Sequence, residues 1–275
     1  MGSDLPRRLG VAAIGIPLSA LVVYVGGVPF AAGLGLLALI ATWELGRMLR
    51  TRGHRMVTPL AMAGAAGFPL AVLWFQAPGA WLVTAALVIT AAGTAALRVR
   101  PAEGPFVATA LTVVGALYLG GLLSFGVPLR EHLVSGRAQG TLLFFFPVLV
   151  TWASDTAAYF GGRRFGRRRL APVVSPNKTV EGAVAALLAG PIVAVAFGLW
   201  ILPKLGQLGP GVLLLLGLLV SAAAIVGDLA ESALKRECGV KDASNLLPGH
   251  GGLLDRLDSL LWTIPIAYLT LRALG

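Results

Sequence analysis

Charged side chains are scarce in this sequence. Asp, Glu, Lys and Arg together make up 12% of its 275 residues, whereas about 25% is usual for a soluble domain. Hydrophobic residues make up 57%. This composition argues against an ordinary soluble domain.

Cysteine and histidine are scarce as well. Cys238 is the single cysteine, which excludes a disulfide within the chain and leaves open a reactive thiol or an incidental one. The three histidines, His54, His132 and His250, are scattered and give no zinc-ligand pattern. A Walker phosphate loop and a G-x-G-x-x-G fingerprint are also absent.

Apolar runs recur along the whole chain instead. Each is about 20 residues long, the length that crosses a bilayer core of ~30 Å. We identify nine, at about 9–27, 29–48, 57–76, 79–97, 105–127, 141–160, 180–202, 210–228 and 253–273. The sequence therefore predicts an all-α, polytopic membrane protein with about nine transmembrane helices. Because further runs follow the first, a signal peptide is not expected.

The basic residues indicate how these helices are oriented. If the runs alternate across the membrane, all but four of the 22 Lys and Arg residues lie on one side; the exceptions are Arg130, Arg137, Lys204 and Arg272. The positive-inside rule then places the N-terminus and the polar loops 161–179 and 229–252 in the cytoplasm, as in a multi-pass protein of the cell (inner) membrane. The net charge of +10 is explained by this topology and by anionic lipid or phosphate, so no nucleic-acid partner is expected.

The two parts of the chain differ in their polar residues. Residues 1–140 have few polar groups within the apolar runs, and we expect them to form a scaffold or dimerisation region. Glu44 is the main exception, interpreted most simply as a helix-end carboxylate that reaches the interface or pairs with Arg47. Residues 141–275 hold the polar motifs and are expected to form the catalytic transmembrane region.

The polar motifs begin late in the sixth run. Asp155 is an ionisable group in a predicted membrane helix, which indicates either function or pairing inside the bundle. The five arginines between residues 163 and 169 serve either as a topology anchor or at a site. In the next motif, SPNKTVEG (175–182), Asn177 or Thr179 can cap the following helix, and the nearby Lys178 favours an anion there.

Half of the 12 acidic residues lie between Asp228 and Asp258. If the eighth helix continues through Lys235, then Asp228, Ser232 and Lys235 share one face. Asp255 and Asp258 are three residues apart at the start of the ninth helix, where its dipole favours acids. Antiparallel eighth and ninth helices would bring Asp228 to the membrane depth of Asp255.

Three carboxylates near several lysines and arginines indicate hard-cation chemistry. Mg²⁺ commonly binds one or two carboxylates together with substrate phosphates. Phosphoryl and nucleotidyl transfer depend mainly on such charge neutralisation and on alignment of the reactants. The glycines around His250 allow a close backbone approach to a ligand. His250 itself either acts as a general acid or phosphate donor, or satisfies the loop backbone.

The stretch SALKRECGVKDASNLLPGHGGLLDRLDS (232–259) resembles the signature of the phosphatidate cytidylyltransferase (CDP-diacylglycerol synthase) family. The fixed positions of that signature match at Ser232, Lys235, Arg236, Lys241, Asp242, His250, Gly251, Gly252, Asp255, Arg256 and Asp258. The stretches GDLAES, SPNKTVEG and DTAAYFGGRRFGR are similar to further family motifs, so the resemblance covers about 155–259. Residues 1–140 resemble the family only in being apolar.

The resemblance implies an enzyme of phospholipid biosynthesis that condenses CTP with phosphatidate in the membrane, giving CDP-diacylglycerol and pyrophosphate. It implies Mg²⁺ as cofactor, with a second cation and a homodimer left open. In the roles we expect, Asp228 and Asp255 hold the metal, and Asp258 supports it or a second cation. The expected phosphate-binding residues are Lys178, Lys235, Arg236, Lys241 and Arg256. Ser175, Asn177, Ser232, Asp242 and His250 would orient the substrates, while Asp155 and Glu181 would support them.

Two alternatives remain at this point. A CTP-dependent polyprenol kinase would transfer the terminal phosphoryl group of CTP to a hydroxyl. A transporter of an anionic solute would use Asp155 and the arginines as a substrate path, but it would not need acids and a His-Gly-Gly loop gathered at one cytoplasmic face.

Overall fold

The computed structural model describes residues 4–75, 79–97, 104–246 and 251–274. The chain divides into two compact units, each made of two segments. The first unit comprises Met1–Pro128 and Glu237–Arg256, and the second comprises Leu129–Arg236 and Leu257–Gly275. Whether the functional division lies near residue 140, as the sequence predicts, stays a prediction.

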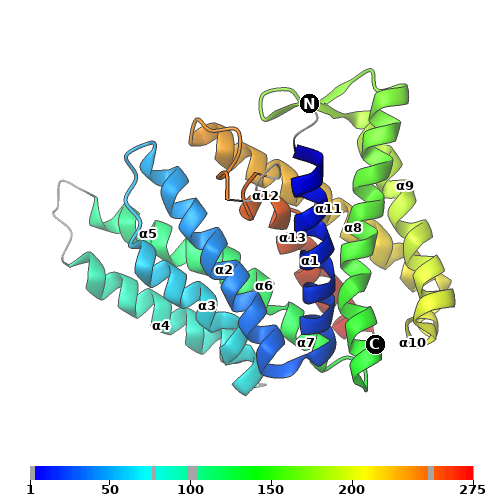
Figure 1. Ribbon diagram of the computed structural model, residues 1–275, viewed down its shortest axis with the longest axis horizontal. Coiled ribbons are helices and arrows are strands. Elements are labelled where there is room, and N and C mark those ends of the chain that lie inside the picture. Colours follow the sequence, from blue (N-terminus) through cyan, green and yellow to red (C-terminus); the bar gives the residue numbers. More distant parts are fainter. Residues whose placement is uncertain (1–3, 76–78, 98–103, 247–250, 275) are drawn as a thin grey trace. The chain divides into compact units, whose positions relative to one another are not determined.

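The first unit is helical (Figure 1). Its helices are α1 (Asp4–Val25), α2 (Gly27–Arg50), α3 (Thr58–Phe75), α4 (Gly79–Ala96), α5 (Pro105–Ala116), the π-helical turn η2 (Leu117–Gly121) and α6 (Leu122–Ser124). Helix α2 packs on α3, α3 on α4, and α4 on α5. Small residues permit this packing: a Cβ on Gly35 of α2 would lie 2.8 Å from the carbonyl oxygen of Ala66 on α3.

The second unit contains the long helices of the C-terminal half. Its elements are α8 (Arg137–Phe165), β1 (Arg169–Ala171), β2 (Ser175–Thr179), α9 (Val180–Ala196), the π-helical turn η3 (Phe197–Ile201), α10 (Pro203–Gly206), α11 (Pro210–Glu237) and α13 (Leu260–Leu274). Two short helices, α7 (Gly126–Glu131) and α12 (Leu254–Leu257), lie where the chain passes between the units.

Helices α8, α9 and α11 pack closely through small and hydroxyl residues. Helices α8 and α9 lie side by side (Figure 1), and a Cβ on Gly182 would lie 2.7 Å from the carbonyl oxygen of Ala158. The hydroxyl groups of Ser154 on α8 and Ser221 on α11 are hydrogen-bonded at 2.8 Å, and both side chains are buried. Small and hydroxyl residues thus permit the close approach of α8 to α9 and of α8 to α11.

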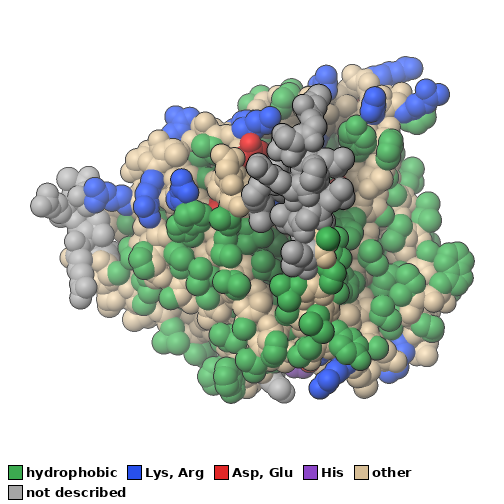
Figure 2. All heavy atoms as spheres, viewed as in Figure 1, with side chains coloured by type: hydrophobic (Ala, Val, Ile, Leu, Met, Phe, Trp, Pro, Cys, Tyr) green, Lys and Arg blue, Asp and Glu red, His purple; other side chains and the backbone are tan. Residues whose placement is uncertain are grey.

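Large apolar side chains face outward, as expected in a lipid environment. On α9, Val184, Leu188 and Ile192 recur every four residues and are all exposed, and Figure 2 shows hydrophobic side chains crowding the face that it draws. Among the described residues, six segments are long and apolar enough to cross a membrane: Gly27–Arg50, Thr58–Phe75, Pro105–Glu131, Arg137–Phe165, Val180–Ile201 and Pro210–Glu237. The prediction of a helical protein with several helices long and apolar enough to cross a membrane is confirmed.

All nine predicted membrane segments coincide with helices. The three beyond the six candidates are α1 and α4, which contain shorter apolar stretches at Gly15–Val25 and Gly79–Ala95, and α13, which has 15 residues. The count of nine transmembrane helices stays a prediction.

The predicted loop 161–179 contains regular structure. Helix α8 continues to Phe165, and β1 and β2 then form an antiparallel hairpin in which Arg169 pairs with Thr179 and Ala171 with Ser175. Pro176 favours this outcome because the residue before a proline is driven into the extended region. Within the described residues, this hairpin is the exception to the all-α prediction.

Candidate active site

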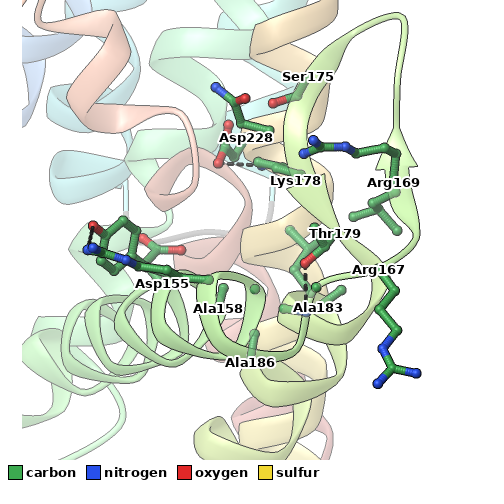
Figure 3. Close-up of a pocket in the computed structure, with 18 residues that line it drawn as sticks. Asp155, Ala158, Arg167, Arg169, Ser175, Lys178, Thr179, Ala183, Ala186 and Asp228 are labelled. Carbon is green, nitrogen blue, oxygen red and sulfur yellow. Dashed lines mark hydrogen bonds and ion pairs between the residues drawn. The ribbon is translucent and has the colours of Figure 1, made fainter.

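A cavity of about 910 Å³ lies in the second unit among α8, the β-hairpin, α9 and α11 (Figure 3). Five of the residues predicted for the site line it: Asp155, Ser175, Asn177, Lys178 and Asp228. The hairpin supplies Ser175, Asn177 and Lys178 from one strand, β2, while α8 supplies Asp155 and α11 supplies Asp228. Three motifs that are far apart in the sequence thus meet around one space.

Lys178 and Asp228 form the central contact of this cavity. The Lys178 ammonium is paired with Oδ2 of Asp228, as the dashed line in Figure 3 marks. Their side chains are 26% and 34% exposed, so both groups are accessible from the cavity. An accessible ion pair has a modest net energy because water screens it, so each partner can exchange the other for a ligand at low cost.

Two further carboxylates lie within the electrostatic reach of Asp228. Asp155 faces the cavity from α8, and Asp258 follows α12; both repel the Asp228 carboxylate. Gly227 allows the Asp258 segment to approach α11, since a Cβ there would lie 2.7 Å from the Asp258 carbonyl oxygen. Ser259 fixes the same segment by donating to the Ala224 carbonyl at 3.2 Å.

Helix α11 carries the next group of predicted residues. It continues to Glu237, as the spacing of Asp228, Ser232 and Lys235 requires. The Ser232 hydroxyl donates to Oδ1 of Asp228 at 3.4 Å, and the Lys235 ammonium lies 2.5 Å from the carboxylate of the fully buried Glu231. Glu231 lies in the GDLAES motif but is not among the predicted site residues.

The two ends of the hairpin are fastened to neighbouring helices. Oγ1 of Thr179 accepts from the Gly182 N–H at 3.1 Å, so Thr179 rather than Asn177 caps α9. Glu181 accepts from the backbone N–H of Arg168 at 3.2 Å. Arg236 on α11 donates to the Val174 carbonyl at 3.4 Å. Glu181 and Arg236 therefore help to hold the strand that presents Lys178.

Arginines missed as site residues also line the cavity. Arg163, Arg167 and Arg169 are lining residues, and in Figure 3 the side chain of Arg169 is turned inward whereas that of Arg167 is turned outward. The signal was present in the sequence, but a run of arginines beside an apolar helix also fits a topology anchor. The cavity favours a role in binding phosphate, because guanidinium groups match phosphate oxygens.

The other predicted residues belong to the first unit or lie outside the described residues. Lys241, Asp242 and Arg256 are exposed. Oδ2 of Asp255 accepts from the Ala243 N–H at 3.0 Å and from the Gly252 N–H at 2.8 Å. His250 lies outside the described residues.

The oxygen donors of these motifs suit a hard cation. No group of three or more His, Cys, Asp or Glu side chains within the described residues has the arrangement of a complete metal centre. Mg²⁺ does not require one, because it usually binds one or two carboxylates and completes its coordination with substrate phosphates and water. Asp228, flanked by two acids and open to the cavity, fits such a shared ion.

Comparison with known proteins agrees with these features. The chain matches the Cytidylyltransferase family over residues 6–274, and it belongs to that family. It is 31% identical over 280 residues to the phosphatidate cytidylyltransferase of Bacillus subtilis (strain 168), an alignment that covers 98% of each chain. Over 136 residues it is 42% identical to the phosphatidate cytidylyltransferase of Haemophilus influenzae, covering 49% of this chain and 47% of that relative.

Proposed function

We propose that this protein is a phosphatidate cytidylyltransferase, which condenses CTP with phosphatidate to give CDP-diacylglycerol and pyrophosphate. The observation that carries the proposal is the similarity over nearly the full length to the Bacillus subtilis enzyme. The cavity adds a physical reason, because its acidic and basic side chains suit phosphates and a cation, and its walls include helix α9, whose outward face is apolar.

In the proposed reaction an oxygen of the lipid phosphate attacks the α-phosphorus of CTP. The bond from that phosphorus to the oxygen bridging the β-phosphate breaks, and pyrophosphate leaves. The lipid phosphate is already an oxyanion at neutral pH, so a strong general base is not required. The protein's task is to neutralise and align several phosphates, for which we propose Lys178, Lys235, Arg236, Lys241, Arg256 and the cavity arginines.

Other residues are proposed to hold and orient the reactants. Ser175, Asn177, Ser232, Asp242 and His250 would bind polar groups of the substrates, with Asp155 and Glu181 supporting them. Asp228, Asp255 and Asp258 would hold Mg²⁺ and, if there is one, a second cation. A bound Mg²⁺ supplies positive charge that stabilises the phosphate oxygens as the bond changes proceed.

The proposed setting is the cell membrane, with nine helices crossing it and the N-terminus in the cytoplasm. Loops 161–179 and 229–252 would then face the cytosol, where CTP is found, while phosphatidate reaches the site from the bilayer. A homodimer built through residues 1–140 is part of the same proposal.

Radiolabelled CTP tests this function directly. Purified protein in detergent is given Mg²⁺, phosphatidate and CTP labelled at either the α- or the γ-phosphate. We expect the α-label to appear in lipid and the γ-label in pyrophosphate. Transfer of the γ-label to a polyprenol would identify the rival kinase, and the absence of any turnover in detergent would favour the transporter.

A further inference from the structure

Glu44 is a fully buried carboxylate in the half of the chain to which no motif assigns a role. It lies on α2, yet both its oxygens bind residues about 200 positions away. Oε1 accepts from the Ser244 hydroxyl at 2.5 Å and from the Leu253 N–H at 3.0 Å, and Oε2 accepts from the Leu254 N–H at 2.7 Å. All of these residues belong to the first unit.

The buried carboxylate of Glu44 depends on these hydrogen bonds for its stability. A carboxylate removed from water without partners is strongly destabilised, so buried charges are retained where donors replace the lost hydration. Here all three donors come from the signature segment, by which we mean the described residues 244–246 and 251–254, rather than from the helices around α2. The contact therefore fastens that segment as much as it stabilises α2.

A second carboxylate, that of Asp255, accepts hydrogen bonds from the backbone of the same region. Oδ2 of Asp255 joins the backbone of Ala243 to that of Gly252, next to the residues that Glu44 joins. Gly252 leaves space for both, because a Cβ there would lie 2.9 Å from Oε1 of Glu44 and 2.9 Å from the Ser244 nitrogen. As a result of these contacts, the start of α12, which carries Asp255 and Arg256, is held against α2.

We propose that Glu44 is a positioning residue for the reaction: it holds the signature segment on α2 and thereby orients Asp255 and Arg256. The inference rests on the proposed function, in which these two residues act on metal and phosphate. It also assigns a task to the N-terminal helices, which present the buried carboxylate that organises a catalytic segment.

Glu44→Gln tests the proposal, because it keeps the size of the side chain but replaces one acceptor oxygen with a donor facing N–H groups. We expect kcat to fall about 10- to 100-fold, as for other residues that orient a ligand-binding side chain, with little change in either KM. Glu44→Asp retains the carboxylate and should restore part of the activity. Thr42→Val is the matched control: Thr42 is equally buried on α2, but its hydroxyl bonds only its own helix, at the Ala38 carbonyl.

The native thiol gives a second readout that does not depend on activity. Cys238 precedes the segment, is 3% exposed, and its carbonyl accepts from the Thr51 hydroxyl on the C-terminal side of α2 at 2.8 Å. Burial, assisted by the charge of Glu237, raises the pKa of Cys238 above its ordinary value although Arg52 opposes the shift. Alkylation should therefore be slow in the wild type, several-fold faster in Glu44→Gln, and unchanged in Thr42→Val.

The outcomes separate the two proposals. If Glu44→Gln resembles Thr42→Val in both kcat and thiol labelling, the positioning role is wrong, whatever happens to thermal stability. If wild-type protein fails to transfer cytidylyl groups but labelling still rises in Glu44→Gln, the proposed function fails while the fastening of the segment stands. Should Glu44→Gln not fold, Ser244→Ala removes one of the three bonds and should give a smaller change in the same two measurements.

Discussion

At the scale of single residues, charged side chains of the second unit satisfy one another before any substrate arrives. Lys178 is paired with Asp228 in the cavity, and Lys235 is paired with the buried Glu231 on α11. A phosphate that enters the cavity can take over Lys178, which leaves Asp228 available to a cation. The resting ion pair thus keeps both groups in place at a modest energetic cost.

The first prediction concerns this pair. Asp228→Asn removes a charged ligand but keeps the shape of the side chain, and we expect kcat to fall by about 100-fold or more, which corresponds to about 2.7 kcal/mol of transition-state stabilisation. Lys178→Met should cause a comparable loss. Because the two act as a unit, the double variant should be little worse than either single one. Steady-state kinetics in mixed micelles measures all three, and two mild effects that multiply would contradict a shared role.

The second prediction separates the two acids of the DRLD sequence. Asp255 binds two backbone N–H groups of its own segment, whereas Asp258 lies near Asp228 and Asp155. Asp255→Asn should therefore both reduce activity and accelerate alkylation of Cys238, because the segment loosens. Asp258→Asn should reduce activity and raise the Mg²⁺ concentration needed for half-maximal rate, with Cys238 as slow as in the wild type. Equal rates of Cys238 alkylation in the two variants would contradict a structural role for Asp255.

The contrast between Glu44 and Asp228 explains how far sequence can predict a site. Asp228, Ser232 and Lys235 follow one another at helical spacing, so their shared face is readable from the chain. Glu44 has no partner nearby in sequence, because its donors lie at Ser244, Leu253 and Leu254. The simplest prediction was a helix-end carboxylate that reaches the interface or pairs with Arg47, whereas Glu44 is fully buried and its oxygens accept from Ser244, Leu253 and Leu254. Arg47 instead lies over the ring of Trp43.

At the scale of elements, the predicted helices follow from the length and continuity of the apolar runs. The hairpin β1–β2 was not predicted, because Ser175-Pro176 followed by Asn and Lys is equally typical of a loop that leads into a helix cap. Its strands have three and five residues, too short for a clear alternating pattern. The cap itself, at Thr179, was one of two candidates and is confirmed.

The third prediction concerns the contact of α9 with α11. A Cβ on Gly217 would lie 2.6 Å from the Gly190 carbonyl oxygen and 2.6 Å from Cα of Pro191, both backbone atoms that cannot move aside alone. Gly217→Ala should destabilise the protein by about 1–3 kcal/mol, the usual cost of overpacking, and lower Tm in detergent. Gly211→Ala is the control, since it lies on the same helix with nothing within 4 Å of the added methyl group. Equal melting temperatures for Gly217→Ala and Gly211→Ala would mean that α9 and α11 can move apart at this contact without a loss of stability.

At the scale of the whole molecule, similarity to the family extends over residues 6–274, well beyond the motifs at 155–259. The N-terminal helices are therefore part of the family's common structure rather than an addition to it. Their composition does not explain why the family has these helices, since apolar runs of this kind occur in any polytopic protein. The contact of Glu44 with the signature segment supplies one physical reason for keeping them.

The last prediction concerns topology, and helix α4 decides it. Its 18 residues span about 27 Å at 1.5 Å per residue, close to the ~30 Å bilayer core, although it is not among the six longer candidates. If α4 crosses, the basic segments at 47–55 and 163–178 lie on the same side, as the positive-inside rule requires; if it does not, they lie on opposite sides.

Cysteines introduced at exposed positions in a Cys238→Ser background test this topology. With a membrane-impermeant maleimide, His54→Cys, Arg168→Cys and Asn245→Cys should react only from the cytoplasmic side. Gln207→Cys should react only from outside, and so should Leu274→Cys if α13 crosses as well. Reaction of positions 54 and 168 from opposite sides would rule out the nine-helix topology.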